Sequence, residues 1–324
     1  MKAWISDQKG PQGLSLGNQP LPEPGPEEVV IQVHAAALNF SDLLMIGDAY
    51  QVRPPRPFVP GQEVSGVVVK AASASPWKTG DRVATKVNWG GFAEYACVPA
   101  NMPIALPAEI DHAEAACVPV SYTTAMVALT ECAPFSPGDF ILVHAAAGGV
   151  GIASVQIATG MGATVIATAG NPEKLELARS YGADHLVNYR DPDWVRQVRE
   201  IAGDGARVIV DPVGGAVGED SLRCLARDGT LLIVGFASGA IPKLAANRLL
   251  LKRASARGVY WNHSDDVEML ERVSARIIKM LNAGIISPVV DARDGLEALP
   301  QALDDLAARR TSGKIVLRLR NKEE

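Results

Sequence analysis

Residues 140–151 read FILVHAAAGGVG, an apolar run that passes directly into small residues and then into a helical pattern. Gly148 and Gly149 allow the backbone to approach an anionic group without an intervening Cβ, and Gly151 permits a helix to pack closely against a strand. The helix N-terminus offers unused N–H groups to phosphate oxygens. Although Ala146 replaces the first glycine of the usual pattern, the order of strand, turn and helix predicts a pyrophosphate-binding turn rather than a tight turn that merely needs small residues. The predicted contacts are Ala147, Gly148, Gly149 and Val150.

The chain after this turn alternates short apolar runs with amphipathic stretches. Asn171, before Pro172, is a predicted helix N-cap, and Gly182 is a predicted helix end. Such alternation is typical of βαβ units, so we expect an α/β fold with a doubly wound, Rossmann-type parallel sheet. The predicted strands cover 140–144, 164–168, 185–188, 208–211 and 230–234, and the predicted helices cover 149–161 and 172–181.

The two ends of the chain have a different texture. Short β-like runs separated by Pro and Gly fill the first third, for example 28–33, 61–70 and 81–84. Beyond residue 258 the pattern predicts helices over 266–283 and 296–309 and a strand over 314–319. Because so short a terminal segment needs a partner to bury its apolar face, we expect it to join the N-terminal region. The predicted domains are a discontinuous β-rich domain of residues 1–120 and 260–324 and an inserted dinucleotide-binding domain of residues 121–259.

Composition excludes several classes of protein. The chain has 324 residues, and its 31 Lys and Arg against 36 Asp and Glu give a formal charge of -5. The cations are scattered, so no nucleic-acid partner is expected. No apolar run approaches the roughly 20 residues that cross a bilayer, and no signal-peptide core is seen at the N-terminus, so no membrane partner is expected. Four widely spaced cysteines predict reduced thiols and a cytoplasmic location.

The end of the second predicted strand indicates which nicotinamide cofactor fits. NAD-specific proteins carry Asp or Glu there to bond the ribose hydroxyls, whereas this chain has Ala169, Gly170 and Asn171. A 2′-phosphate therefore has room, and Lys174 and Tyr189, within the run Asn188-Tyr189-Arg190, can supply cationic and hydroxyl donors. The sequence predicts NADPH, held in part by Gly170, Lys174 and Tyr189.

Two further loops follow predicted strands at their carboxyl ends, where open α/β sheets bind ligands. They are residues 211–215 and 234–238. We expect these loops to flank the nicotinamide and its ribose. The predicted contacts are Asp211, Val213, Gly235, Phe236 and Ser238.

Six motifs are spread along the chain: ALNFSD (37–42), PGQEVSG (60–66), GDRV (80–83), GFAEY (91–95), the turn at 146–151 and GKIVL (313–317). Together they resemble the zinc-free quinone oxidoreductases of the medium-chain dehydrogenase/reductase superfamily. The resemblance implies a GroES-like fold for the β-rich domain. Zinc-dependent relatives carry Cys at the position of Asn39 and His at that of Gln62, and their four-cysteine lobe would follow residue 83. The five histidines are dispersed, so we expect no metal site.

By this resemblance, Asn39 and Asp42 line the catalytic cleft near the nicotinamide, and Thr123 and Lys314 contact the cofactor. Tyr50 matches a tyrosine that related enoyl-thioester reductases use as proton donor or substrate anchor; a loop tyrosine that shapes the pocket is the alternative. The resemblance also implies a homodimer formed through sheet edges of the cofactor domain. The candidate edges are residues 208–210 and 230–236.

We expect direct hydride transfer from NADPH to a quinone or another activated small-molecule acceptor such as an enone. A 2-enoyl-thioester reductase is the second interpretation, with Arg53 and Arg56 available to a carrier phosphate. The third, from a different class, is an NADPH-binding structural or regulatory protein with little turnover.

Overall fold

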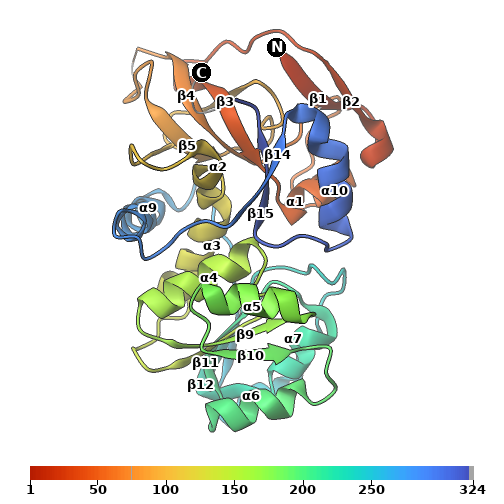
Figure 1. Ribbon diagram of the computed structural model, residues 1–324, viewed down its shortest axis with the longest axis vertical. Coiled ribbons are helices and arrows are strands. Elements are labelled where there is room, and N and C mark those ends of the chain that lie inside the picture. The colour runs from red at the N-terminus through yellow and green to blue at the C-terminus, as the bar shows by residue number, and fades with distance from the viewer. Residues whose placement is uncertain (74, 321–324) are drawn as a thin grey trace. The chain divides into compact units, whose positions relative to one another are not determined.

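The computed structural model describes residues 1–73 and 75–320, and these form two compact units (Figure 1). Unit 1 contains Met1–Val120 and the chain from Pro288 onward, and unit 2 contains Ser121–Ser287. We had assigned residues 260–287 to the β-rich domain, but the structure places them in unit 2. The reason is specific contacts: the indole of Trp261 donates to Thr124 Oγ1 at 3.1 Å, and the Gln156 amide bonds both the N–H and the carbonyl of Ser287.

Unit 2 is built on a parallel sheet with the strand order β10-β9-β8-β11-β12-β13. The strand order reverses between β8 and β11, because the chain adds β9 and β10 on one side and β11 to β13 on the other. The doubly wound sheet expected from the sequence is confirmed. Its strands are β8 (Phe140–Val143), β9 (Thr164–Ala169), β10 (His185–Asn188), β11 (Ala206–Asp211), β12 (Leu225–Ile233) and β13 (Ser255–Gly258).

The predicted edges of this sheet were wrong. Strand β11 lies between β8 and β12, and β12 lies between β11 and β13, so both have hydrogen-bonded neighbours on each side. Among the described residues the edges are β10 and β13. Residues 255–258, with the sequence SARG, lack the apolar run by which the other strands were recognised.

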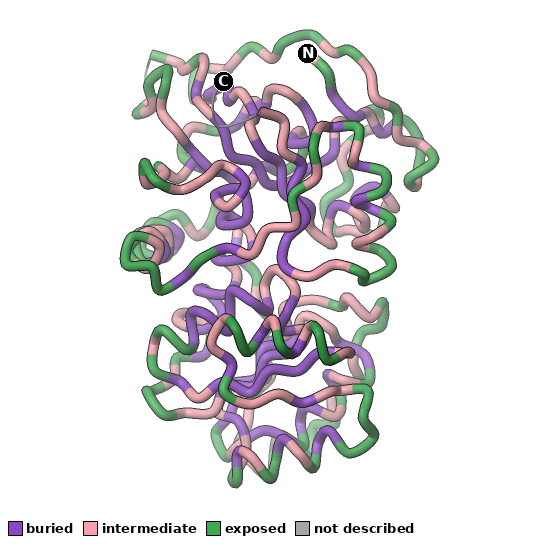
Figure 2. The backbone as a smooth tube through the Cα atoms, in the orientation of Figure 1, coloured by how far each residue is buried: buried purple, intermediate pink, exposed green. Residues whose placement is uncertain are grey.

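Helices pack around the strands of unit 2 (Figure 1). The α5 helix begins as predicted, since the Asn171 side chain accepts from Lys174 N at 2.9 Å, and Gly182 beyond its end has φ 108°. The core joins the sheet to α6, and the buried strand backbone stands out in Figure 2. The helices are α3 (Thr123–Met126), α4 (Gly149–Gly160), α5 (Pro172–Ser180), α6 (Trp194–Ala202), α7 (Gly215–Ser221), α8 (Ala246–Lys252) and α9 (Val267–Asn282).

Unit 1 is the β-rich part. Its larger sheet has the order β14-β15-β3-β4-β5-β7, and β6 also pairs with β3. The C-terminal strand β15 lies antiparallel to β3, which confirms that this segment joins the N-terminal region. The strands are β1 (Lys2–Ser6), β2 (Leu14–Asn18), β3 (Glu28–Ala37), β4 (Glu63–Ala71), β5 (Arg82–Lys86), β6 (Tyr95–Pro99), β7 (Ile104–Ala105), β14 (Val290–Asp294) and β15 (Lys314–Arg318).

The core of unit 1 is made by apolar residues of these strands together with α10 (Leu299–Ala307). Two short helices flank it, α1 (Phe40–Ile46) and α2 (His112–Ala115). All four cysteines are unpaired, and burial raises the pKa of each thiol. Within the described part of the chain, no helix combines the length and apolarity needed to cross a membrane.

Candidate active site

In the predicted phosphate turn of unit 2, the backbone of Gly151 passes very close to the backbone of Ala145 and Ala146. Ala145 adopts the left-handed φ of 48°, and its carbonyl accepts from Gly148 N at 2.8 Å. A Cβ on Gly151 would lie 2.2 Å from that carbonyl oxygen, so only glycine fits there. Gly148 is the N-cap of α4 and caps it with no side chain, which leaves the N–H groups of the first turn available to an anion. The structure therefore supports the packing role inferred for Gly151.

His144 fixes the strand just before this turn. Its Nδ1 lies 2.7 Å from Thr168 Oγ1 on β9, and its Nε2 lies 2.8 Å from Ser221 Oγ on α7. Because the Ser221 hydroxyl already donates to Val217 O, His144 Nε2 carries the proton and Nδ1 accepts from Thr168. Burial lowers the pKa of His144, with the Asp211 carboxylate opposing the shift. A neutral imidazole thus ties three elements together beneath the turn.

The predicted 2′-phosphate residues meet where β9 and β10 end side by side. Asn188 pairs with Ala169 in the ladder, so Gly170 and Tyr189 leave the sheet at the same level. A Cβ on Gly170 would lie 3.0 Å from Arg190 Nε and 3.4 Å from the Tyr189 ring. The absence of a side chain at 170 therefore makes room for a guanidinium and a phenol. Lys174 is in the first turn of α5, whose N-cap follows Gly170 directly.

The other two predicted cofactor loops are hydrogen-bonded to each other. Val234 N donates to Asp211 O at 3.0 Å, and Ser238 N donates to Val213 O at 2.9 Å. The Asp211 carboxylate is buried and accepts from Val213 N at 2.8 Å and Gly214 N at 3.0 Å, so it folds its own loop. Phe236 in the second loop is 40% exposed. The five predicted residues of these loops are therefore brought together at the carboxyl edge of the sheet.

Thr123, another predicted cofactor contact, stands at the start of α3 in unit 2. It is buried, and its Oγ1 has no hydrogen-bond partner among the described residues. An unsatisfied buried hydroxyl costs about 1–3 kcal/mol, which a bound ligand or water would relieve.

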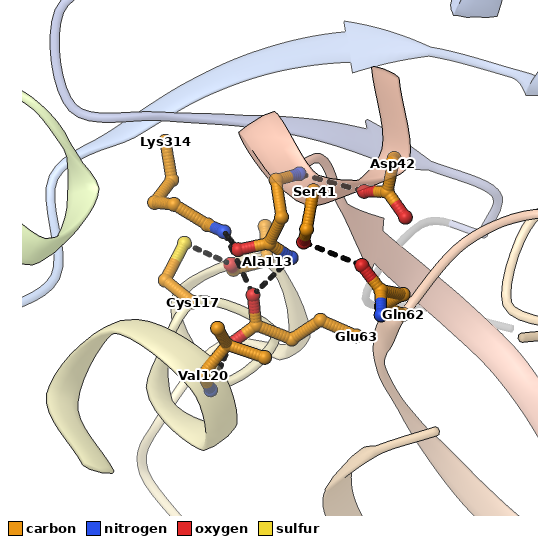
Figure 3. Close-up of polar contacts among 9 residues, drawn as sticks. Ser41, Asp42, Gln62, Glu63, Ala113, Cys117, Val120 and Lys314 are labelled. Carbon is orange, nitrogen blue, oxygen red and sulfur yellow. Dashed lines mark hydrogen bonds and ion pairs between the residues drawn. The ribbon is translucent and has the colours of Figure 1, made fainter. Parts of the chain in front are cut away.

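In unit 1, Asn39 belongs to a polar cluster with Lys314 and Glu63. Figure 3 shows the labelled Lys314, Glu63 and Val120 of this cluster close together. Lys314 Nζ donates to Asn39 Oδ1 at 2.6 Å and to Glu63 Oε2 at 2.7 Å, while Asn39 Nδ2 donates to the same Glu63 oxygen at 3.0 Å. Val120 N donates to the second oxygen, Glu63 Oε1, at 2.6 Å. Side-chain exposure is 0% for Glu63 and 6% for Lys314. Lys314, which the sequence predicts to contact the cofactor, is thus hydrogen-bonded to Asn39, which the sequence predicts to be catalytic.

Asp42 lies beside this cluster in the first turn of α1. Its Oδ2 accepts from Asn39 N at 2.7 Å, and its buried Oδ1 has no partner among the residues described. Burial raises the pKa of Asp42 to about 7, and Glu63 adds to the rise while backbone hydrogen bonds and Lys314 oppose it. Gln62, at the position of the zinc-ligating histidine of relatives, accepts from Ser41 Oγ at 2.5 Å. Asp42 is therefore a carboxyl group that titrates near neutrality.

Tyr50 is half-buried in the loop after α1, and its carbonyl accepts from Arg53 Nε at 3.4 Å. Arg56 is committed to holding this loop: its guanidinium donates to Asp48 at 2.7 Å and to Ile46 O at 2.9 Å. It also contacts Ser6 Oγ. Three of the five N–H donors of Arg56 are therefore bonded within unit 1, and a contact between Arg56 and a carrier phosphate stays a prediction.

Two of the dispersed histidines meet in unit 1. The rings of His34 and His112 lie 4.6 Å apart, and His112 Nδ1 is 2.7 Å from Ser65 Oγ. Burial is the main cause that lowers the pKa of His112 to about 4, and the nearby His34 and Arg82 lower it further. Across residues 1–73 and 75–320 no group of three or more His, Cys, Asp or Glu side chains could hold a metal ion.

Sequence reasoning missed three residues that the structure makes prominent. Glu63 was quoted only within a motif, and a glutamate at the start of an apolar strand does not by itself indicate that it is buried. Arg190 was noted only as part of a run, but its side chain covers Gly170. His144 precedes the glycine-rich turn, and nothing in the local pattern distinguishes a buried histidine that links neighbouring elements from a solvated one.

A doubly wound domain with a glycine-rich phosphate turn, inserted in a β-rich domain, defines a nicotinamide-dependent oxidoreductase of the medium-chain type. Residues 149–276 match the family described as zinc-binding dehydrogenase, and residues 25–108 match the alcohol dehydrogenase GroES-like domain. The chain belongs to the quinone oxidoreductase family of the medium-chain dehydrogenase/reductase superfamily.

Three comparisons carry that assignment. Quinone oxidoreductase-like protein 2 of Rattus norvegicus is 39% identical over 98% of this chain and 97% of its own length. Quinone oxidoreductase of Sus scrofa is 31% identical over 96% of the chain and 95% of its own length. A mycobacterial structure complexed with NADPH has a TM-score of 0.92 and 32% identity, covering 98% of this chain and all of that one (100%). The resemblance read from the motifs is confirmed.

Proposed function

We propose that this protein transfers a hydride from NADPH to a small acceptor with a conjugated carbonyl, such as a quinone, without using a metal ion. The observation that carries the proposal is the Asn39 amide, which is held by Lys314 and Glu63 and has one N–H with no acceptor among the described residues. A fixed donor of this kind stabilises negative charge that develops on a carbonyl oxygen. Water supplies the proton that completes the conversion of quinone to hydroquinone.

The cofactor is NADPH, and the residues of unit 2 fit it. Gly151 lets α4 pack closely against the phosphate turn. Because Gly170 has no Cβ, Arg190 and Tyr189 lie close to its backbone, where they would offer a guanidinium and a phenol to a 2′-phosphate. No carboxylate ends β9, so nothing there repels that phosphate. When bound, NADPH supplies the hydride; Lys174, Tyr189 and the loops of Asp211 and Gly235 would hold it. Structural relatives complexed with NADPH support this assignment.

Metal independence is part of the proposal. Where zinc relatives carry Cys and His, this chain has Asn39, whose oxygen faces the Lys314 ammonium, and Gln62, whose oxygen accepts from Ser41. An amide oxygen occupied by a cationic donor is a poor ligand for a second cation.

The deciding assay is NADPH oxidation with 1,4-benzoquinone and with crotonyl-CoA, in the presence of a metal chelator and with NADH in parallel. We expect chelator-insensitive turnover of the quinone with preference for NADPH. Turnover of crotonyl-CoA alone would instead identify a 2-enoyl-thioester reductase. Tight NADPH binding without turnover across a broad acceptor panel would identify a structural or regulatory NADPH-binding protein.

A homodimer formed by the β13 edge of unit 2 is also proposed. Among the described residues β13 pairs only with β12, so its outer backbone is open. Leu250 and Leu251, adjacent residues of α8, are each 77% exposed, and exposed apolar residues that are contiguous favour an interaction site. Sedimentation is expected to show a dimer, and an L250E/L251E variant should be a monomer. A cytoplasmic location stays a prediction of the sequence.

A further inference from the structure

The Asn39 amide has a single possible orientation. Lys314 presents an ammonium, which only donates hydrogen bonds, and it lies 2.6 Å from Asn39 Oδ1. Glu63 presents a carboxylate, which only accepts, and it lies 3.0 Å from Asn39 Nδ2. Turning the amide over would set its NH2 against the ammonium and its oxygen against the carboxylate. Both ends of the amide are therefore fixed by charge.

The two charged side chains are themselves immobilised. Glu63 Oε2 accepts from Lys314 Nζ at 2.7 Å, and Glu63 Oε1 accepts from Val120 N at 2.6 Å. Glu63 is completely buried and Lys314 almost so. Glu63 is the first residue of β4 and Lys314 is the first residue of β15, while Val120 lies in a helical turn at the end of unit 1. The orientation of Asn39 is thus set by the fold of unit 1 and not by a mobile surface contact.

One N–H of Asn39 is left over. The residue is only partly buried, and no second acceptor for Nδ2 occurs among the described residues. We propose that Glu63 and Lys314 are positioning residues that make Asn39 present an N–H, never its carbonyl, to the acceptor. The inference rests on the proposed function and narrows it: the acceptor must offer an oxygen that accepts a hydrogen bond, as quinones and enones do.

This assignment differs from a direct contact between Lys314 and the cofactor. Both of the Lys314 bonds described above lie inside unit 1, and withdrawing the ammonium to reach a ligand would leave the buried Glu63 carboxylate unpaired. Removing one partner of a buried pair is costly, so the ammonium stays with Glu63.

The first test reads the amide directly in the cofactor-free protein. In a 15N-asparagine sample, the side-chain NH2 signal absent from N39A belongs to Asn39. Its two protons should be widely separated, because one bonds a carboxylate and the other does not. K314M and E63Q should each reduce that separation, whereas K2M, which breaks the exposed Lys2–Glu297 pair at 3.4 Å, should leave it unchanged. An Asn39 signal identical in wild type, K314M and E63Q would overturn the proposal.

The second test separates positioning from cofactor binding. K314M should lower kcat for 1,4-benzoquinone by about 10- to 100-fold, since a misdirected donor loses most of its effect on the transition state. The Kd for NADPH should stay within about twofold, and K314R should recover part of the activity because it restores a cation. A loss of NADPH affinity as large as the loss of kcat would make Lys314 a cofactor ligand and end the positioning role.

Two controls distinguish a loss of positioning from a loss of folding and from a failure of the proposed function. The double variant E63Q/K314M leaves no unpaired buried charge, so it should fold where K314M is too unstable, and it should show the same loss of kcat. If the wild type reduces no acceptor, the proposed function fails, but the Asn39 signal in the first test still decides the positioning role.

Discussion

The phosphate turn of unit 2 and the polar cluster of unit 1 are built in opposite ways. The turn is made of consecutive residues, 144–151, and works through backbone groups and missing side chains. The cluster is made of charged and polar side chains from residues 275 positions apart in the chain, Asn39 and Lys314, joined by Glu63. A site of the first kind fails when atoms are added to it, and a site of the second kind fails when one charge is taken away.

The largest effect is expected from breaking the buried charge pair. K314M should lower the free energy of unfolding by about 3–5 kcal/mol, because Glu63 is left ionised and buried. The double variant E63Q/K314M should recover most of that loss, and K2M, on an exposed pair, should change stability by about 0.5 kcal/mol or less. Urea unfolding of the four proteins checks this. A double variant as unstable as K314M would mean that lost packing, not charge, causes the effect.

Adding one methyl group to the turn should come next. In G151A the new Cβ meets the Ala145 carbonyl at 2.2 Å, so α4 must move away from β8. We expect a loss of about 3 kcal/mol in unfolding free energy, as for other overpacked sites, together with loss of NADPH binding. The matched control is G258A, in which the Cβ meets nothing within 4 Å. Thermal unfolding and NADPH fluorescence distinguish the two, and equal behaviour of the variants would contradict the close approach at Gly151.

The carboxyl of Asp42 should make the unit 1 cluster sensitive to pH. Because the folded pKa of about 7 lies above the unfolded value, Asp42 contributes stability at low pH that is lost as the pH rises towards 7. Between pH 5.5 and 7 the loss is about 2 kcal/mol, at about 1.4 kcal/mol per pKa unit. In D42N an amide replaces the neutral acid and cannot ionise. The stability of D42N relative to wild type should therefore rise across this range, and a constant difference would show that Asp42 does not titrate there.

The smallest effect concerns cofactor choice in unit 2. R190A should weaken NADPH binding about tenfold and leave NADH binding unchanged, because only NADPH carries the 2′-phosphate that Arg190 and Gly170 would accommodate. R179A is the control, since Arg179 is an exposed arginine of α5 paired with Glu176. Equal weakening of both cofactors by R190A would place the 2′-phosphate elsewhere.

The same contrast explains what the sequence could predict. The turn at 144–151 was recognised because its function depends on order along the chain: apolar strand, small residues, helix. Strands β8 to β10 and helices α4 and α5 were placed within one or two residues for the same reason. Edge strand β13 was missed because SARG carries no apolar alternation, and its place depends on pairing with β12.

The unit 1 cluster could be predicted only as separate residues. Asn39 and Lys314 were assigned roles one by one through resemblance, and no local pattern indicates that they touch. Glu63 was missed because a glutamate beside apolar residues is usually at a surface, and only tertiary structure reveals its burial. The partners of Arg56, which include Asp48 and Ile46, could likewise not be predicted, because they approach it only when the loop is folded.

Gln156 has a consequence for how such a chain can be assembled. Its amide bonds Ser287, where unit 2 ends, and accepts from the hydroxyl of Tyr122, where unit 2 begins, at 3.3 Å. Both ends of unit 2 are therefore tied to one residue of α4. A segment whose ends meet can interrupt another domain at little cost in loop-closure entropy. Residues 121–287 thus have the form of a cassette whose entry and exit points lie together.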